Sequence, residues 1–551
     1  MADVWIAGLS TGHNASTCLL KNGEIVFYIE EERLSRQKYD DSPFLGILKI
    51  KEYTDKLDYL AISNGPPYST IDENNPFVKL ALKLGLISSP NFVFASASHH
   101  TYHAASGFYS SGFDSAVCVV IDAAGSYIEK DKEGSSGVEI ESIYHVEYPA
   151  KFKSIWKRCG NTFNKDTTRL NETFFVSEPG IAAMYSALSM SMGHSNLECG
   201  KVMGLASYGK PDDTIPPIFV DINGQRSPNR NLFRANLKNY PLPSMDNIQE
   251  YNRENLCYAV QQATQSAATD IILRALKETG SKKLVISGGY ALNCVANYEY
   301  LKHVPSDVEI FIDPPAYDGG QSIGVAKLAY NHLNRVTTPN KAQTSYCIGP
   351  QPKIDNVEEL LNESEQSLTV DYKDVVKLLV KGDPVGIFQG GSEAGPRALG
   401  NRSILFDPRV KDGKDIVNKI KGREWYRPFA GSVLREYAHQ WFDMRGLAES
   451  PFMMYAVDVL KERRGEIPSV VHVDGTCRVQ TVGPEQNLHF YNLIKEFLNQ
   501  TGVPLLFNTS FNLAGDPIVE TLEDALDTLR RSKLEYLYLP DANLLITGKN
   551  I

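Results

Sequence analysis

The stretch SHHTYHAASGFYSSGFDSAVCVVIDAAG, residues 98–125, contains the two patterns on which the fold prediction depends. Its first half places His99 and His103 four residues apart, which puts both imidazoles on one face of a predicted helix. Its second half contains the apolar run 116–121, which predicts a buried strand that ends at Asp122. Two imidazoles on one helical turn and a carboxylate at a strand end are typical of a metal or phosphate site. The open alternative is that one histidine caps the helix, another packs, and Asp122 begins a turn.

Upstream of this stretch, the sequence predicts a group of three strands, at residues 3–9, 17–20 and 24–29. The dipeptide Asn22-Gly23 between the second and third strands is a strong hairpin signal. The small, polar segment between the first two strands contains His13. Its ordinary pKa of about 6.5 would suit a general base that removes a hydroxyl proton near neutral pH. A structural or solvent-exposed role is the alternative for a lone histidine.

Downstream, a predicted strand at 284–286 runs into Ser287-Gly288-Gly289 and then into a helix from about Tyr290. A strand, a glycine-rich turn and a helix N-terminus form an arrangement that can cradle phosphate, because free backbone N–H groups point at the anion. Turns of this kind also occur as simple connections, so the pattern alone leaves both interpretations open.

Asp318 lies in DPPAYDGG, residues 313–320, where the neighbouring glycines allow a close approach of the backbone. Together with His99, His103 and Asp122, it would complete a set of two histidines and two carboxylates. Such a set suits iron(II), manganese or zinc better than calcium, which prefers oxygen ligands alone. The alternative is an aspartate that begins a turn before glycines.

Length and composition predict a soluble protein of several domains. The chain has 551 residues and a net charge of -10, which argues against a broad nucleic-acid-binding surface. No apolar run is long enough to span a membrane, the first residues do not form a signal peptide, and eight scattered cysteines suggest free thiols in the cytoplasm. The polar, proline-bearing segment 338–356 predicts a domain boundary, which divides the chain into 1–345 and 346–551. No repeat of fixed period is visible, and residues 212–250 read as a surface excursion.

The second half concentrates cations among glycine, proline and aromatic residues rather than among acidic ones. A charge in such surroundings requires an anionic partner, and the planar fork of arginine matches phosphate or carboxylate oxygens. A phosphate-rich small molecule is therefore the predicted ligand, and internal salt bridges are the alternative. The residues are Arg397, Arg402, Lys421, Arg423, Arg427 and Arg478.

Residues 505–507 predict a buried strand that ends in Asn-Thr-Ser-Phe-Asn, residues 508–512. Clustered amides and hydroxyls at a strand end fit hydrogen bonding to a ligand. They fit an ordinary loop with Asx turns equally well.

Eight ordered motifs resemble the NodU/TobZ-type O-carbamoyltransferase family over nearly the whole chain. Each motif alone is weak, whereas their order and content together are specific. They are Gly-His-Asn-Ala-Ser (12–16), Glu-Glu-Glu-Arg (30–33), His-His-x-x-His (99–103), Gly-Leu-Ala-Ser-Tyr-Gly-Lys-Pro (204–211), Ser-Gly-Gly-x-Ala-Leu-Asn (287–293), Gly-Pro-Arg-Ala-Leu-Gly-Asn-Arg-Ser (395–403), Arg-Pro-Phe-Ala (427–430) and Asn-Thr-Ser-Phe-Asn (508–512).

The resemblance implies an α/β fold with two domains. Residues 1–345 would form a Kae1-like domain of the actin/sugar-kinase/Hsp70 (ASKHA) superfold, and 346–551 a YrdC-like domain with a twisted mixed sheet. It also implies that the second domain makes carbamoyl-adenylate from ATP, with Mg, and carbamoyl phosphate. The first domain would then transfer the carbamoyl group to a substrate hydroxyl with the help of a metal.

The resemblance further implies roles for individual residues, which are transferred only where the motifs match. His13 would be the base, and iron(II), or else manganese or zinc, would be the ion. The metal ligands would be His99, His103, Asp122 and Asp318. The first domain's nucleotide contacts would be Ser287, Gly288, Gly289 and Asn293. The carbamoyl phosphate and adenylate site would comprise Arg397, Lys421, Arg423, Arg427, Arg478, Asn508 and Ser510, of which Lys421, Arg427, Arg478 and Ser510 would be catalytic.

Two positions depart from the family pattern. The family commonly has Asp-Gly where this chain has Asp122-Ala-Ala-Gly125, which predicts different nucleotide contacts there. The family often has glycine before the last metal aspartate, where this chain has Tyr317. The bulk of this side chain predicts a reshaped acceptor pocket and affects the expected metal geometry.

Three other functions remain open from the sequence. A tRNA threonylcarbamoyladenosine-type enzyme would use related domains, but the acidic balance counts against RNA binding. A small-molecule kinase of the same superfold would leave the cation-rich second domain without a role. A non-enzymatic ATP-driven binding protein would not need the His/His/Asp/Asp set. The expected acceptor is a specialised metabolite, with no nucleic acid or membrane partner, and a homodimer is consistent with the prevalence of twofold symmetry.

Overall fold

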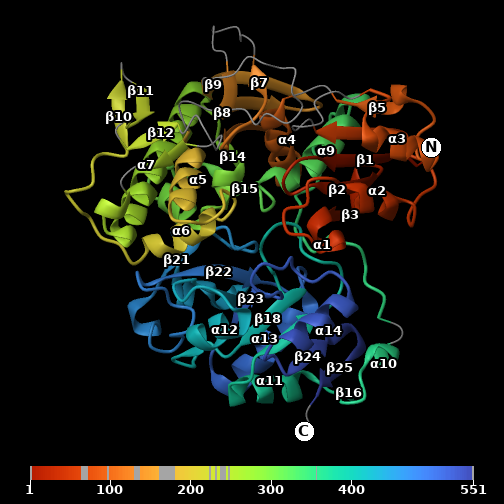
Figure 1. Ribbon diagram of the computed structural model, residues 1–551, viewed down its shortest axis with the longest axis vertical. Helices are drawn as coiled ribbons and strands as arrows, with labels where there is room; N and C mark the ends of the chain where they lie inside the picture. Colours follow the sequence, from red (N-terminus) through yellow and green to blue (C-terminus); the bar gives the residue numbers. More distant parts are fainter. Residues whose placement is uncertain are drawn as a thin grey trace. The chain divides into compact units, whose positions relative to one another are not determined.

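The chain folds into two compact units in the computed structural model (Figure 1). The structure describes residues 3–63, 72–95, 98–128, 137–160, 180–222, 225–229, 232–235, 243–245, 248–354 and 357–548. The first unit comprises residues 1–31 and 39–343, and the second comprises residues 32–38 and 344–551. The long connection is therefore at 343/344, close to the predicted boundary at 345/346. The excursion of residues 32–38 into the second unit was not predicted.

The first sheet of the first unit has the strand order β3-β2-β1-β4-β5. Its first three strands are antiparallel, whereas β1, β4 and β5 run parallel. Asn22 and Gly23 turn β2 into β3 with φ angles of 53° and 86°, as the hairpin signal predicted. The strands are β1 (Trp5–Ser10), β2 (Ser16–Lys21), β3 (Glu24–Glu30), β4 (Tyr59–Ser63) and β5 (Val93–Phe94).

The second sheet repeats this order and these directions with different strands. Strands β9, β8 and β6 are antiparallel, and β6, β14 and β15 run parallel, so β9-β8-β6-β14-β15 matches β3-β2-β1-β4-β5. The first unit is thus a duplicated α/β arrangement. The strands are β6 (Ser115–Ile121), β8 (Gly137–Glu147), β9 (Lys151–Gly160), β14 (Lys283–Ser287) and β15 (Glu309–Ile312), with β7 (Tyr127–Ile128) added beside β8.

Two helices lie between these sheets, α4 (His99–Ser111) and α9 (Gln321–Leu333). Helix α9 packs on β1, β2 and β4, α4 packs on β6 and β14, and the two helices pack on each other. Their contact is close, because a Cβ atom at Gly324 of α9 would lie 2.1 Å from the carbonyl oxygen of Tyr102 in α4. This packing fixes the N-terminal turns of α4 and α9 relative to the ends of the second sheet's strands.

The remaining helices of the first unit surround the two sheets. Long α7 packs on α5, α6 and β6. Two small hairpins, β10–β11 and β12–β13, occupy described parts of the predicted excursion 212–250. The elements are α2 (Phe44–Ile50), α3 (Pro76–Lys83), α5 (Ile181–Ser191), α6 (Cys199–Ala206), β10 (Phe219–Ile222), β11 (Gln225–Pro228), β12 (Phe233–Ala235), β13 (Pro243–Met245), α7 (Arg253–Thr279) and α8 (Cys294–Tyr300).

The second unit is built on one mixed sheet in the order β16-β25-β24-β17-β18-β23-β19-β22-β21-β20. The pairs β17–β24 and β19–β22 are parallel, and the other pairs are antiparallel. The strands are β16 (Gln366–Thr369), β17 (Val385–Phe388), β18 (Arg402–Phe406), β19 (Ala430–Leu434), β20 (Phe442–Asp443), β21 (Ala456–Val459), β22 (Thr476–Val482), β23 (Leu505–Ser510), β24 (Tyr536–Leu539) and β25 (Leu544–Thr547).

Helix α14 closes one hydrophobic core of the second unit. Its Leu522, Leu526 and Leu529 pack with Phe388 and Ile404 of the sheet. Thr521 and Asp524 form a capping box at its N-terminus. This cap starts the helix directly before Leu522, its first core residue. The helices are α1 (Glu31–Ser35), α10 (Val357–Leu360), α11 (Tyr372–Lys381), α12 (Gly413–Lys421), α13 (Leu488–Thr501) and α14 (Leu522–Arg531).

Two predicted boundaries were wrong. The helix expected from Tyr290 begins at Cys294, because residues 289–292 form a 3-10 turn and the Asn293 side chain caps α8 by accepting the Ala296 N–H. The strand expected to end at Phe507 continues to Ser510, because residues 507–510 pair with residues 403–406 of β18. The amides and hydroxyls of that motif therefore begin on a strand rather than in a loop.

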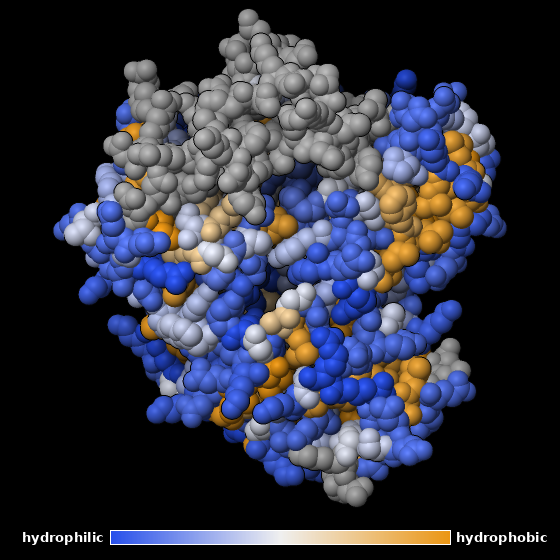
Figure 2. All heavy atoms as spheres, viewed as in Figure 1, coloured by the Kyte–Doolittle hydropathy of each residue, from blue (hydrophilic) through white to orange (hydrophobic). Residues whose placement is uncertain are grey.

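The surface is mainly hydrophilic in the view of Figure 2, with hydrophobic side chains gathered over α2 and α3. Phe44, Leu45 and Leu48 of α2 are among the exposed hydrophobic residues. All eight cysteines lie in the described ranges, and none of them is in a disulfide. Among the described residues, no helix has both the length and the apolar character required to cross a membrane.

Candidate metal centre and anion pocket

The candidate metal centre lies where three parallel strands of the second sheet end. Asp122 follows β6, Gly288 and Gly289 follow β14, and the segment that leads to Asp318 follows β15. Because the carboxyl ends of adjacent parallel strands meet at one edge, residues far apart in the sequence are brought together there. Asp318 begins the 3-10 turn directly before α9, so the packing of α9 also fixes its position.

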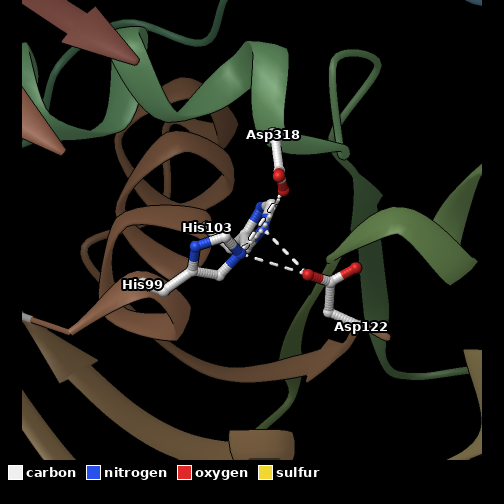
Figure 3. A group of neighbouring side chains, drawn as sticks. All are labelled: His99, His103, Asp122 and Asp318. Carbon is white, nitrogen blue, oxygen red and sulfur yellow. Dashed lines mark hydrogen bonds and ion pairs between the residues drawn. The ribbon is translucent and has the colours of Figure 1, made fainter. Parts of the chain in front are cut away.

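His99 and His103 approach this edge from the first two turns of α4. Both histidines are buried, and the four-residue spacing directs their rings to the same side of the helix. Figure 3 shows the two imidazoles directed toward the carboxylates of Asp122 and Asp318. The structure therefore brings together all four residues that the sequence predicted as ligands.

The distances between the four side chains suit a shared ion. The Nε2 atoms of His99 and His103 are 3.1 Å apart. The Nε2 atom of His99 lies 3.1 Å from Asp122 Oδ2 and 3.3 Å from Asp318 Oδ1. All four donor atoms lie within 4.8 Å of one another. Adjacent ligands of one ion with bonds of about 2.0–2.2 Å lie about 3 Å apart, so the donor set and its spacing both fit a divalent transition metal.

The four side chains of this cluster form internal ion pairs. Burial alone would lower the pKa of His99, but the Asp318 and Asp122 carboxylates outweigh it and raise this pKa to about 10. The pKa of His103 is also raised, against burial, by its hydrogen bonds to the same two aspartates. Burial would raise the pKa of Asp122, yet the two imidazoles hold it well below its usual value. Protons on the histidines thus occupy the electrostatic role that a cation would take.

His13 and Gln321 also contact the cluster. His13 Nε2 lies 3.4 Å from Asp318 Oδ2, and its side chain is 49% exposed, so the predicted base is both accessible and next to the metal centre. Gln321 was not predicted. Its Nε2 lies 3.0 Å from His99 Nε2, 3.1 Å from His103 Nε2 and 3.3 Å from Asp318 Oδ1. Only tertiary proximity brings this glutamine to the histidines, and no local signal marks it.

His100 contributes to the surroundings of the centre rather than to the ligand set. Its Nδ1 is 2.7 Å from Ser142 Oγ, and burial lowers its pKa to about 3, so the ring is neutral. A Cβ atom at Gly125 would lie 2.8 Å from the His100 ring, so the glycine three residues after Asp122 leaves room for it. The two departures from the family pattern, Asp122-Ala-Ala-Gly125 and Tyr317, do not separate the candidate ligands. Their four donor atoms lie within 4.8 Å of one another.

The predicted nucleotide loop of the first unit adjoins the metal centre. The N–H of Gly289 donates to Asp122 Oδ1 at 3.1 Å, and Gly288 has a φ of 88° that favours glycine. Ser287 and Asn293 are buried. The Asn293 amide nitrogen is engaged with Gln261 Oε1 at 3.1 Å, so in this structure it has a structural role in addition to capping α8.

The candidate anion pocket of the second unit is centred on Lys421, the last residue of α12. Its Nζ contacts the Ser510 carbonyl oxygen and lies 2.8 Å from that of Asn512 and 3.3 Å from Ser510 Oγ. Burial and then the charges of Arg423, Arg427 and Lys38 hold the pKa of Lys421 well below its usual range. The Asn-Thr-Ser-Phe-Asn motif therefore binds the predicted catalytic lysine directly.

Three arginines belong to the same cation cluster, in which Arg423 and Arg427 act on Lys421 while Arg427 and Arg478 act on Arg423. Burial, followed by the charges of Arg427 and Arg478, lowers the pKa of Arg423. The nearest carboxylate bound to Arg427 is Glu424, at 3.6 Å. Arg423 is held by Asn418 Oδ1 at 2.7 Å and stacks 4.1 Å from the centre of the Phe429 ring. A buried group of like charges is stabilised when an anion binds among them.

The sheet register brings the remaining predicted pocket residues to neighbouring strands. Ala430 of β19 pairs with Arg478 of β22 on one side and with Asn508 of β23 on the other. The side chain of Asn508 is fully buried, and its Nδ2 lies 3.0 Å from Ser432 Oγ and 3.2 Å from Gln480 Oε1, so it supports the strands.

Arg397 and Arg402 have different surroundings although they flank the same short segment. Arg397 is partly exposed in the loop between β17 and β18. Arg402 is fully buried, donates to the carbonyl oxygens of Gln389 and Glu520, and stacks 3.9 Å from the Phe388 ring. Arg402 is therefore bound internally, through backbone carbonyl oxygens rather than through the salt bridges that the sequence left open.

Lys38 was not predicted as part of the pocket. It belongs to the short segment that the N-terminal part of the chain contributes to the second unit, and its charge depresses the pKa of Lys421. Its Nζ bonds Glu32 Oε1 at 2.7 Å. An electrostatic effect between residues nearly 400 positions apart leaves no local pattern in the sequence.

Two family models match the chain. The model described as "Carbamoyltransferase N-terminus" matches residues 78–327, and "Carbamoyltransferase C-terminus" matches residues 376–545. The first match contains all four candidate metal ligands, and the second contains the cation cluster.

Curated relatives extend the similarity over most of the chain. The nodulation protein NolNO of Sinorhizobium fredii is 30% identical over 560 residues, which cover 95% of this chain and 78% of that protein. A 3'-hydroxymethylcephem-O-carbamoyltransferase of Streptomyces clavuligerus is 30% identical over 357 residues, which cover 59% of this chain and 61% of that protein.

Among solved structures, full-length HypF in its phosphate- and nucleotide-bound form is similar to part of the chain. The sequence identity is 14% and the TM-score is 0.38, with 60% of this chain and 56% of that chain covered.

Proposed function

This chain belongs to the carbamoyltransferase family and is an O-carbamoyltransferase, and we propose that it works through a carbamoyl-adenylate made from ATP and carbamoyl phosphate. The observation that carries the proposal is the presence of two sites that differ in charge, a charge-balanced His/Asp cluster in the first unit and a cation cluster in the second. Each site fits one half of such a reaction.

The first half-reaction is assigned to the second unit. Water would hydrolyse carbamoyl phosphate to carbamate and inorganic phosphate. A carbamate oxygen would then attack the α-phosphorus of ATP, and pyrophosphate would leave with the electrons of the broken P–O bond. Lys421, Arg427 and Arg478 would bind the phosphate oxygens and stabilise the charge that develops on them. Ser510 Oγ lies beside the Lys421 ammonium and would orient it. Arg397 and Arg423 would complete the positive surroundings, and Mg would accompany ATP.

The second half-reaction is assigned to the first unit. The acceptor hydroxyl would attack the carbamoyl carbon, and AMP would leave with the pair of electrons of the broken anhydride bond. His13 would take the hydroxyl proton. Its exposed side chain and the 3.4 Å between its Nε2 and Asp318 Oδ2 support this role. Ser287, Gly288 and Gly289 would bind the adenylate phosphate through the loop that touches Asp122.

A divalent metal fits the first unit's cluster. His99, His103, Asp122 and Asp318 would hold it, and their mixed nitrogen and oxygen donors suit iron(II), with manganese or zinc as the other candidates. When bound, the ion supplies Lewis-acid chemistry. Gln321 would help to orient His99 and Asp318, since its amide lies against both.

The finer fold assignments belong to the same proposal. The duplicated strand order of the first unit supports a Kae1-like domain of the actin/sugar-kinase/Hsp70 superfold. The mixed sheet of the second unit is compatible with a YrdC-like domain.

The acceptor class follows from the relatives. The cephem relative's name specifies a hydroxymethyl group on a small molecule as its acceptor. We infer that this chain likewise carbamoylates a hydroxyl of a small specialised metabolite, rather than tRNA.

The test is pyrophosphate release from ATP, measured with and without carbamoyl phosphate in the absence of acceptor. Release that depends on carbamoyl phosphate is the expected result. Formation of ADP and phosphate would instead indicate a kinase and would contradict the adenylate.

A further inference from the structure

The motif Glu-Glu-Glu-Arg, residues 30–33, lies where the chain passes from the first unit to the second. Glu31 still belongs to the first unit, where its carboxylate accepts the N–H groups of Leu45 and Gly46 at 2.6 and 2.9 Å. Residues 32–38 belong to the second unit, and Tyr39 returns to the first. None of the roles proposed above accounts for Arg33, although it is almost completely buried.

The guanidinium of Arg33 binds two backbone carbonyls of one loop. One terminal nitrogen donates to the Glu393 carbonyl oxygen at 2.5 Å, and the other donates to that of Gly395 at 2.7 Å. The two carbonyls are two residues apart, so the planar fork of the guanidinium fixes their separation and direction.

The loop held in this way carries Arg397. The Glu393 carboxylate accepts the N–H groups of Leu399, Asn401 and Arg402 at 2.7 to 3.1 Å, which closes the far side of the loop. Gly395 has a φ of 94°, a left-handed conformation that favours glycine. Arg33 therefore binds the backbone that precedes Arg397, and the Glu393 carboxylate binds the backbone that follows it.

Arg36 anchors the same segment at a different place. Its terminal nitrogens donate to the carbonyl oxygens of Ile518 and Pro517 at 2.7 and 3.1 Å, and its Nε lies 3.4 Å from Asp524. These contacts involve the turn before α14 and not the loop that contains Arg397. Residues 32–38 therefore contain one arginine that binds the loop, Arg33, and a second arginine that binds elsewhere, Arg36. Arg36 can serve as the control for Arg33.

We propose that Arg33 is a positioning residue of the adenylation site, which acts by holding the loop 390–397 so that Arg397 faces the bound anion. The inference rests on the proposed function, because it takes the second unit as the place where carbamoyl phosphate binds. The inference gives the Glu-Glu-Glu-Arg motif a role. Through Arg33, an N-terminal segment of the chain would hold a loop of the second unit's site.

The test compares the full-length variants Arg33→Lys, Arg36→Ala, Arg397→Ala and the double variant Arg33→Lys/Arg397→Ala with the wild type. The measurement is the KM for carbamoyl phosphate in pyrophosphate release. A lysine keeps the charge but cannot bind two carbonyls with a fixed fork, so we expect the KM to rise about tenfold with little change in kcat. Because Arg33 acts through Arg397, the double variant is expected to match Arg397→Ala alone. Arg36→Ala should lower the melting temperature while leaving the KM unchanged.

An unchanged KM in Arg33→Lys, or effects of Arg33→Lys and Arg397→Ala that multiply, would overturn the inference. A wild type without pyrophosphate release that depends on carbamoyl phosphate would instead count against the proposed function. In that case, calorimetric titration of the same variants with inorganic phosphate tests the inference. Weaker binding in Arg33→Lys than in Arg36→Ala supports the positioning role. Equal binding in the two variants, or no binding, refutes it. A far-UV circular dichroism spectrum like that of the wild type shows that each variant, including its second unit, is folded.

Discussion

The two candidate sites differ in how their charges are balanced. In the first unit, two carboxylates and two imidazoles pair with one another, so the pKa values of the aspartates fall and those of His99 and His103 rise. In the second unit, a lysine and three arginines face one another, and the pKa values of Lys421 and Arg423 fall through burial and mutual repulsion. The first site is completed by a cation that replaces protons, and the second by an anion.

This difference would separate the two proposed half-reactions physically. The carboxylates of the first site are balanced by the imidazole protons, so a divalent metal would bind there by replacing those protons. The second site would repel a divalent cation and attract an anion. The predictions below ask whether damage to one site leaves the other intact.

The largest effect is expected from loss of a metal ligand. His99→Ala or Asp122→Ala removes one of the four donors and should reduce bound divalent metal and carbamoyl transfer, the transfer by at least about 10³-fold. Pyrophosphate release by the second unit should persist, because it does not use this cluster. Metal content, transfer and pyrophosphate release are measured on the same preparation.

The matched control for these variants is His303→Ala, which removes a partly exposed histidine that pairs with Glu299. It should retain metal and both activities. Equal loss of transfer and pyrophosphate release in His99→Ala would contradict the division of labour between the units.

The second-largest effect is expected from loss of a cation in the second unit, which should reduce adenylation and leave metal binding intact. Lys421→Ala or Arg427→Ala should reduce pyrophosphate release by about 10² to 10³-fold, because a positioned cation is removed from the site where phosphate charge develops. Metal binding by the first unit should not change. Lys419→Ala removes an exposed lysine from the same helical turn and serves as the control. Unchanged pyrophosphate release in Lys421→Ala would show that the cation cluster takes no part in this reaction.

The sequence predicted the four residues of the candidate metal centre because each lies in a local pattern. The His-x-x-x-His spacing marks one helix face, and Asp122 and Asp318 follow predicted strands or turns with glycines nearby. Gln321 and Arg33 could not be found in this way, because their contacts join residues 222 and 360 positions apart. Propensity and spacing describe neighbours along the chain, and these contacts depend on how whole elements pack.

The duplicated strand order of the first unit could not be predicted from the sequence, for a related reason. Strand order and direction are the same in both copies, but the strands differ in length and the connections differ greatly. Strands β1 and β4 are separated by residues 11–58, whereas β6 and β14 are separated by residues 122–282. A repeat of topology leaves no fixed period in the sequence, so only the structure reveals it.

The third effect is a pair of opposite pH dependences. The imidazole protons must leave when a metal binds, and because the pKa of His99 is raised to about 10, its proton is still bound at pH 7. Metal affinity should therefore rise with pH up to about pH 10, by about tenfold per unit for each proton released. Inorganic phosphate affinity should fall as pH rises, because the lowered pKa of Lys421 makes its charge the first of the cluster to be lost. Calorimetric titrations with Co²⁺ and with phosphate between pH 6 and pH 9 measure both slopes, and slopes of the same sign would contradict the comparison.

The smallest effect is expected at Gln321, which supports the metal ligands without belonging to them. Its Nε2 lies 3.1 and 3.0 Å from the two ring nitrogens of His99, so the amide rests against the ring face rather than in line with a ring lone pair. Gln321→Leu should keep the packing but lose the bond to Asp318, which lowers Co²⁺ affinity about tenfold. Asn331→Leu is the control, because this buried amide on the same helix bonds the Lys327 carbonyl instead. A loss in Gln321→Leu as complete as that in His99→Ala would make Gln321 a ligand, and no loss would remove it from the centre.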